Sequence, residues 1–217
     1  MASPADDIKL QLHRSVERRA GDRRPATGAR ALSLSRSLQT GRLTLRRPRR
    51  SDADSLALLM NDWEVVRWLV QAPYPYTRSH AVDWIAQNLS NLASGREYQF
   101  VICRDGDLDI IGHAGLRLDD DRRGGEIGYW LARRTWGEGY ASEAAAAVLK
   151  FGFEDLQLGT IWATCLPDNT RSKRVLSKLG LRMAGSMTQK FEPIDQTVTC
   201  PMMTIDRDRY DGGFNGR

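Results

Sequence analysis

The chain has 217 residues, 41% of them hydrophobic and 27% charged, which is enough for one folded domain of ordinary size with an extension. No stretch approaches the roughly 20 consecutive apolar residues that cross a bilayer, and the N-terminus lacks the apolar core of a signal peptide. These features argue against membrane-spanning and secreted proteins, so the cytoplasm is the expected location.

The net charge of +5 is unevenly distributed along the chain. Residues 1–50 carry 13 basic and four acidic side chains, a net charge of +9, whereas residues 51–217 carry 19 and 23, a net charge of −4. We therefore expect a basic, flexible N-terminal extension at 1–39 and a folded domain at 40–210. The last dozen residues look frayed, with a tail at 211–217. An alternative role for the extension is contact with RNA or the ribosome.

The cysteines and histidines do not form a recognisable site. Cys103, Cys165 and Cys200 are odd in number, have no CxxC spacing, and two of them end apolar runs typical of strands. We expect buried, reduced thiols. The three histidines are scattered, so the sequence supports neither a metal site nor a Cys/His nucleophile.

Hydrophobic periodicity predicts an α+β order of elements in the first half of the domain. A strand is expected at 42–46, then helices at 52–60, at 62–69 and from about 77 to 92, then strands at 98–104 and 108–118. The prolines of Pro73–Thr77 exclude a helix there, and Thr77 or Ser79 can cap the helix that follows.

The second half continues the same alternation. Strands are expected at 126–131, 160–165, 181–190 and 197–205, with helices from residue 142 onward and at 170–179. Between the first of these strands and the first helix lies the turn Trp136–Ala141, which contains two glycines in three residues.

This glycine turn is the strongest candidate for a binding site. Glycines remove side chains where the backbone must approach a ligand, and the helix behind them adds unpaired N–H groups and a positive dipole end. The turn therefore favours a bound pyrophosphate, although such turns also occur where the chain only reverses. A third glycine at the dinucleotide-binding position and a Gly-Lys-Ser/Thr motif are both absent from the sequence, which disfavours NAD and ATP.

Six segments in order carry a family pattern: 42–46, 73–77, 111–116, 126–131, 136–144 and 169–180. Together they resemble the GNAT superfamily of N-acetyltransferases, and in detail its ribosomal-protein (RimJ/RimL-like) branch. The resemblance implies an α+β GNAT fold, in which a central, mostly antiparallel mixed sheet of six to seven strands has splayed fourth and fifth strands and about four flanking helices. It also implies an acyltransferase that uses acetyl-CoA and no metal.

In this family acetyl-CoA occupies the V-shaped opening between the splayed strands, here 126–131 and 160–165. Its pantetheine arm would pair as a pseudo-strand from about Leu131 onward. The pyrophosphate would be held by the amides of Gly137, Gly139, Tyr140 and Ala141. The family turn, Arg/Gln-x-x-Gly-x-Gly/Ala, fits here as Trp136–Ala141 or Arg134–Gly139. We prefer the first because of its distance from the strand, and it puts Trp136 where the family often has a polar residue.

Acetyl transfer needs a neutral amine as nucleophile and a general base can provide it. Glu126 begins its strand on the same face as Gly128 and Trp130, where it could receive a proton through water; alternatively it is only a solvated carboxylate. An α-amine, with a pKa of about 7.7–8.0, needs less help than a lysine at about 10.4.

The helix at 170–179 contributes two further candidates. Asn169 could bind pantetheine, cap the helix, or do both. Ser172 lies one turn later and points to the same region. Many relatives have a tyrosine seven residues after this asparagine as the acid for the CoA thiolate, but here the residue is Leu176. Ser172 or water must then protonate the thiolate.

The expected reaction is direct transfer from acetyl-CoA to a primary amine, either a protein N-terminal α-amine, which could belong to a ribosomal protein, or a small-molecule amine. A homodimer is an open possibility. Two alternatives are a non-catalytic acetyl-CoA sensor, favoured by Leu176 and Trp136, and a ribosome- or RNA-associated protein acting through its basic extension. Five aromatic residues could line the acceptor side or pack in the core: Trp63, Trp68, Tyr74, Tyr76 and Trp84.

Overall fold

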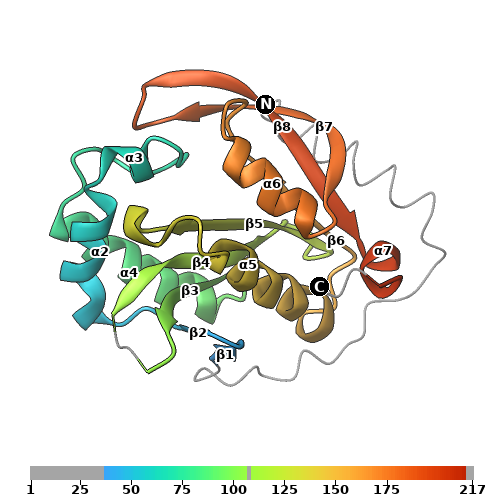
Figure 1. Ribbon diagram of the computed structural model, residues 1–217, viewed down its shortest axis with the longest axis horizontal. Coiled ribbons are helices and arrows are strands. Elements are labelled where there is room, and N and C mark those ends of the chain that lie inside the picture. Colours follow the sequence, from blue (N-terminus) through green and yellow to red (C-terminus); the bar gives the residue numbers. More distant parts are fainter. Residues whose placement is uncertain (1–36, 107–108, 214–217) are drawn as a thin grey trace.

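The computed structural model describes residues 37–106 and 109–213, which form one mixed sheet flanked by helices (Figure 1). The eight strands follow the order β1-β2-β3-β4-β5-β6-β8-β7, and only the β5–β6 pair is parallel. Their bounds are β1 Leu38–Gln39, β2 Leu43–Arg46, β3 Glu97–Arg104, β4 Ile110–Leu118, β5 Gly124–Leu131, β6 Thr160–Thr164, β7 Arg182–Phe191 and β8 Gln196–Asp206.

The expected α+β class is confirmed, but the sheet has eight strands rather than six or seven. The additional strand is β1, which pairs with β2 and places Leu38 in the core at 8% exposure. Two residues are too few to produce the alternation by which longer strands are recognised. The described sheet thus begins two residues before the expected boundary near Thr40. The rest of the basic extension, residues 1–36, lies outside the described residues.

Helices pack on both sides of the sheet. Their bounds are α2 Ala53–Met60, α3 Trp63–Val66, α4 Arg78–Ala93, α5 Tyr140–Lys150, α6 Thr170–Lys178 and α7 Arg207–Asp211, with shorter helical turns at Arg50–Asp52, Arg133–Thr135 and Phe151–Asp155. Thr77 caps α4 as expected, because its hydroxyl accepts a hydrogen bond from the His80 N–H. The expected helix at 62–69 is shorter, and only α3 is regular there.

The alternation of side chains along the strands divides the core into two layers. On β3, Phe100 belongs to the cluster that contains Val148 of α5, whereas its neighbour Val101 packs with Ile85 of α4. Helices α5 and α6 contact each other on one face, and α2 and α4 contact each other on the opposite face (Figure 1). Two-sided burial explains why the central strands read as almost continuous apolar runs.

The two parallel strands diverge soon after they begin. Pairing between β5 and β6 covers only Gly124–Glu126 and Thr160–Trp162, and the rest of β5 pairs with β4 alone. Beyond Glu126, β5 therefore has peptide groups on its β6 side without a strand partner. This confirms the predicted splay of the two strands.

The C-terminal segment is more ordered than expected. Fraying was predicted for the last dozen residues, but α7 forms at 207–211 and its Tyr210 is buried. Tyr210 stacks on Phe153 with ring centroids 4.6 Å apart and donates to Glu154 Oε1 at 2.9 Å. The fraying prediction is therefore wrong for α7, because a single aromatic anchor in a polar segment carries no periodic signal. Residues 214–217 lie outside the described residues.

Cys103, Cys165 and Cys200 are buried, as expected, and no disulfide joins them within the described residues. Within the described ranges, no helix combines the length and apolar character needed to cross a membrane. The same ranges contain no group of three or more His, Cys, Asp or Glu side chains arranged to hold a metal ion.

Candidate active site

The glycine turn stands at the mouth of the opening, directly before α5. Gly137 and Gly139 have φ values of 90° and 81°, a left-handed conformation that glycine adopts without the steric cost other residues incur. Helix α5 starts at Tyr140, two residues earlier than expected, and no side chain caps its N-terminus. The structure thus brings Gly137, Gly139, Tyr140 and Ala141 together at a helix end with unsatisfied N–H groups, a geometry suited to an anion.

Leu131 ends β5 beside this turn, and its peptide groups face the opening. The N–H of the next residue, Ala132, donates to Ile111 O of β4 at 2.8 Å. Since peptide groups alternate direction along an antiparallel strand, those of Leu131 point away from β4. Its carbonyl already accepts a hydrogen bond from Trp136 Nε1 at 2.8 Å. The Leu131 N–H is consequently the group at this position that is best placed to meet a ligand.

The side chain of Trp136 supports the turn. Its Nε1 donates to Leu131 O, and the guanidinium of Arg171 lies over its ring, with Cζ 4.5 Å from the ring centroid. Arg171 comes from α6, across the opening from the turn. A cation thus lies at the position where the family's turn often has a polar side chain. This contact was not predicted, because residues 136 and 171 are distant in sequence.

Glu126 lies at the point where β5 and β6 diverge, since it is the last β5 residue paired with β6. Its side chain is 17% exposed and forms an ion pair with Arg117, directly opposite on β4. Gly128, two residues on and on the same face, is exposed, and a Cβ atom built there would meet nothing within 4 Å. The carboxylate therefore borders open space beside the splay. The hairpin register that creates the Arg117 contact could have been derived from the sequence.

The N-terminus of α6 holds the second pair of candidates. Asn169 Oδ1 accepts from the Ser172 N–H at 3.0 Å, so Asn169 is the N-cap. The Ser172 hydroxyl lies 3.0 Å from the Tyr129 hydroxyl, which also donates to Ser172 O at 3.3 Å. Leu176 is fully buried and has no group that could donate a proton.

Tyr129 is the aromatic residue that sequence reasoning missed. It lies on β5, and strand alternation places it on the opposite face from Glu126. Burial raises the pKa of Tyr129, only partly offset by its hydrogen bond to Ser172, so the phenol stays protonated and can donate. The opening therefore has a carboxylate on one face and a pair of hydroxyl groups on the other.

The aromatic residues expected near the acceptor divide into two groups. Trp63 and Tyr74 are partly exposed and lie with ring centroids 5.1 Å apart. The others pack inside: Tyr76 in the α2–α4 layer, Trp84 edge-on to His113, and Trp68 against the β7–β8 hairpin. A hydrogen bond from Glu192 N to Val70 O, 3.0 Å long, joins that hairpin to the segment after α3. This bond and the packing of Trp68 hold the two segments side by side.

His113 lies on β4 and makes a partly buried polar contact. Its Nε2 lies 2.6 Å from Gln99 Oε1, and its ring stacks near Trp130. Desolvation of the ring lowers the pKa of His113 to about 4, so the imidazole is neutral at physiological pH.

Comparisons with known proteins agree with this geometry. The family model for the GNAT acetyltransferase domain matches residues 42–182. The N-acetyltransferase p20 of Bacillus licheniformis is 33% identical over 178 residues, which cover 81% of this chain and 99% of that protein. YdaF of Bacillus subtilis, whose name assigns it provisionally to ribosomal N-acetyltransferases, is 28% identical over 66% of this chain and 79% of its own.

A solved structure of Mycobacterium smegmatis RimJ in complex with CoA-disulfide superposes with a TM-score of 0.69. It is 25% identical and covers 80% of this chain and 87% of its own. The splayed strands, the glycine turn before α5 and these matches lead to one conclusion. The chain belongs to the GNAT acetyltransferase family, in its RimJ/RimL-like branch, and is an N-acetyltransferase that uses acetyl-CoA.

Proposed function

We propose that this protein transfers the acetyl group of acetyl-CoA directly to a primary amine within one ternary complex. The observation that carries the proposal is the opening between β5 and β6, which has the glycine turn at its mouth and Glu126 on one face. The turn would hold the pyrophosphate through its backbone N–H groups, and the pantetheine arm would run along β5 toward the splay. The Leu131 N–H would bind an oxygen of the thioester arm or polarise its carbonyl.

Arg171 supports the placement of the pyrophosphate. Its guanidinium is held on Trp136, and the structure gives it no carboxylate partner among the described residues. A positive charge beside the turn favours a diphosphate. Asn169 acts here as the helix cap, and any contact with pantetheine would be additional to that role.

The acceptor would approach from the face that carries Glu126. As the new C–N bond forms and the C–S bond breaks, the amine must lose a proton and the CoA thiolate must gain one. Glu126 would take the first proton through a water molecule, and the Ser172 hydroxyl, hydrogen-bonded to Tyr129, would donate to the thiolate. Both hydroxyl groups are neutral donors, so together they replace the acid that Leu176 cannot provide.

We propose a protein N-terminal α-amine as the first acceptor to test, with small-molecule amines as the second. The name of YdaF supports the first class, and so does the lower pKa of an α-amine, which suits a single weak base. A ribosomal protein is then a candidate partner. The buried reduced cysteines suit the cytoplasm, and a homodimer stays a prediction.

A transfer assay would test this function. Acetyl-CoA consumption is measured with peptides of varied N-terminal residues, polyamines, amino acids and aminoglycosides. Each active peptide is compared with the same peptide carrying a blocked N-terminus, which should be inactive if the α-amine is the acceptor. Tight acetyl-CoA binding without transfer to any amine would favour the sensor alternative. Binding to RNA that falls steeply with salt would favour the alternative based on the basic extension.

A further inference from the structure

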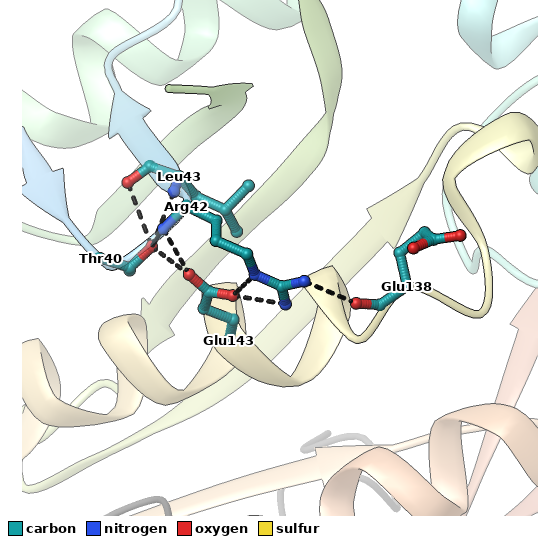
Figure 2. A network of polar contacts seen from close by, with 5 residues as sticks. All are labelled: Thr40, Arg42, Leu43, Glu138 and Glu143. Atoms are coloured by element: carbon teal, nitrogen blue, oxygen red, sulfur yellow. Dashed lines mark hydrogen bonds and ion pairs between the residues drawn. The ribbon is translucent and has the colours of Figure 1, made fainter. Parts of the chain in front are cut away.

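A group of polar contacts outside the opening joins the β1–β2 hairpin to the glycine turn (Figure 2). Arg42, just before β2, donates from Nε to Glu143 Oε2 at 2.7 Å and from Nη1 to Glu138 O at 3.0 Å. Its backbone N–H and the Thr40 hydroxyl donate to the other oxygen of Glu143, at 2.9 Å and 2.6 Å. Two segments about 100 residues apart in sequence are thereby fixed to each other.

The bond to Glu138 O determines how the next peptide is oriented. In a trans peptide the C=O and N–H groups point in opposite directions. With Glu138 O directed to Arg42, the N–H of Gly139 points away from Arg42, to the side that the hydrogen bond leaves open. A peptide next to glycine can rotate at little steric cost. If it rotated here, the turn would present a carbonyl oxygen to the pyrophosphate instead of a donor.

The bond from Arg42 to Glu143 prevents a repulsion between the Glu143 carboxylate and a bound diphosphate. Glu143 lies in the first turn of α5, where an unpaired carboxylate would repel a bound diphosphate. Burial raises the pKa of Glu143, but the hydrogen bonds from Thr40 and Arg42 outweigh it and lower the pKa overall, so the group is ionised. Arg42 neutralises this charge. Its guanidinium also lies over the Tyr140 ring, with Cζ 4.6 Å from the centroid.

We propose that Arg42 is a positioning residue for acetyl-CoA, holding the 138–139 peptide in the anion-binding orientation and cancelling the charge of Glu143. The proposal rests on the placement of the pyrophosphate at the glycine turn. The guanidinium of Arg42 contacts Glu143, Glu138 O and the Tyr140 ring, so we assign its effect to the turn rather than to direct contact with the ligand. The proposal predicts that substitution of Arg42 weakens the binding of the diphosphate part of acetyl-CoA and leaves the binding of the pantetheine part unchanged.

The test compares Arg42→Ala with the wild type in calorimetric titrations with two ligands. CoA contains the diphosphate, whereas pantetheine lacks it and is measured by displacement. The variant should bind CoA about tenfold more weakly or worse, the scale for losing a charge-assisted hydrogen bond, and should bind pantetheine as the wild type does. Arg42→Lys, which keeps the charge but cannot make both side-chain contacts, should fall between the two.

Arg78→Ala is the matched control, because Arg78 forms an exposed 2.7 Å ion pair with Asp54 far from the turn in sequence and fold. It should leave both affinities unchanged. Wild-type CoA affinity in a folded Arg42→Ala protein would overturn the proposal, and so would an equal loss for pantetheine. If Arg42→Ala does not fold, Arg42→Lys answers the same question by the same criteria. Since no acceptor is needed, a failure to find an acetylated amine would leave this result standing.

Discussion

The two sides of the opening are built in different ways. On the donor side, the candidate ligand groups are backbone N–H groups of a short glycine turn and of the first residues of α5. On the acceptor side, the candidate groups are side chains on β4 and β5. A backbone site depends on local sequence, whereas a site of side chains depends on long-range packing. Substitutions should therefore act on acetyl-CoA binding and on catalysis separately.

The largest expected effect is on the donor side. Gly139→Glu should abolish CoA binding, because a carboxylate would crowd and repel the pyrophosphate at a left-handed position. Calorimetry measures the loss. Gly106→Glu is the control, since Gly106 also has a positive φ, 75°, and open space around its Cβ position. Unchanged CoA affinity in the folded Gly139→Glu protein would remove the anion site from this turn.

On the acceptor side, Glu126→Gln should lower kcat/KM by about 100-fold, the usual scale for losing a general base, with CoA affinity unchanged. Raising the pH should partly restore the rate, because the amine then loses its proton without help. Glu97→Gln is the matched control, since Glu97 also lies opposite Arg117 but on β3, away from the splay. A wild-type rate and pH profile for Glu126→Gln would mean that the enzyme only positions an already neutral amine.

His113 gives the stability of the acceptor side a dependence on pH. The pKa of His113 is about 4 in the folded chain and about 6.5 in the unfolded chain. As the pH falls, the unfolded chain is therefore protonated at this histidine before the folded chain is. The contribution of neutral His113 to the free energy of unfolding is complete above pH 6.5 and is lost as the pH falls toward 4. From pH 7 to 4.5 the free energy of unfolding should fall by ~2 kcal/mol more in the wild type than in His113→Gln. Equal losses in urea titrations at the two pH values would contradict this.

The contrast between local backbone features and long-range side-chain contacts also explains what could be predicted from the sequence. The element order and the turn follow from apolar periodicity and glycine spacing, and Thr77 and Asn169 were identifiable as caps from residue type. The splay was implied only by the resemblance to the GNAT superfamily. The Arg42–Glu143 and Arg171–Trp136 contacts join residues far apart along the chain, and no local pattern specifies them. Strand β1 and helix α7 were missed because each is too short to show a period.

The acceptor side was predictable only in part. Strand alternation placed Glu126, Gly128 and Trp130 on one face, and the pairing with β4 agrees with this. The same alternation could have placed Tyr129 on the other face, but nothing in the sequence indicates that its hydroxyl reaches Ser172 on α6. That contact depends on how α6 packs over the opening.

The smallest expected effect concerns this hydroxyl pair. Ser172→Ala and Tyr129→Phe should each lower kcat by roughly three- to tenfold, because a hydroxyl donor to the thiolate contributes about 1 kcal/mol and water can replace it. CoA affinity should change little. If Tyr129 acts by orienting Ser172, its hydroxyl has no effect once Ser172 is gone. The double variant should then be no slower than Ser172→Ala alone.

Single-turnover kinetics with saturating acetyl-CoA would measure this coupling without interference from product release. Thr188→Ala is the control, because Thr188 also shares a hydroxyl–hydroxyl contact, 2.9 Å to Thr199, but on the exposed β7–β8 hairpin. Independent effects, in which the rate losses of Ser172→Ala and Tyr129→Phe multiply, would mean that the two hydroxyls act separately on the leaving group. A wild-type rate in both variants would leave water as the acid. Among the described side chains, proton transfer would then fall to the Glu126 carboxylate alone.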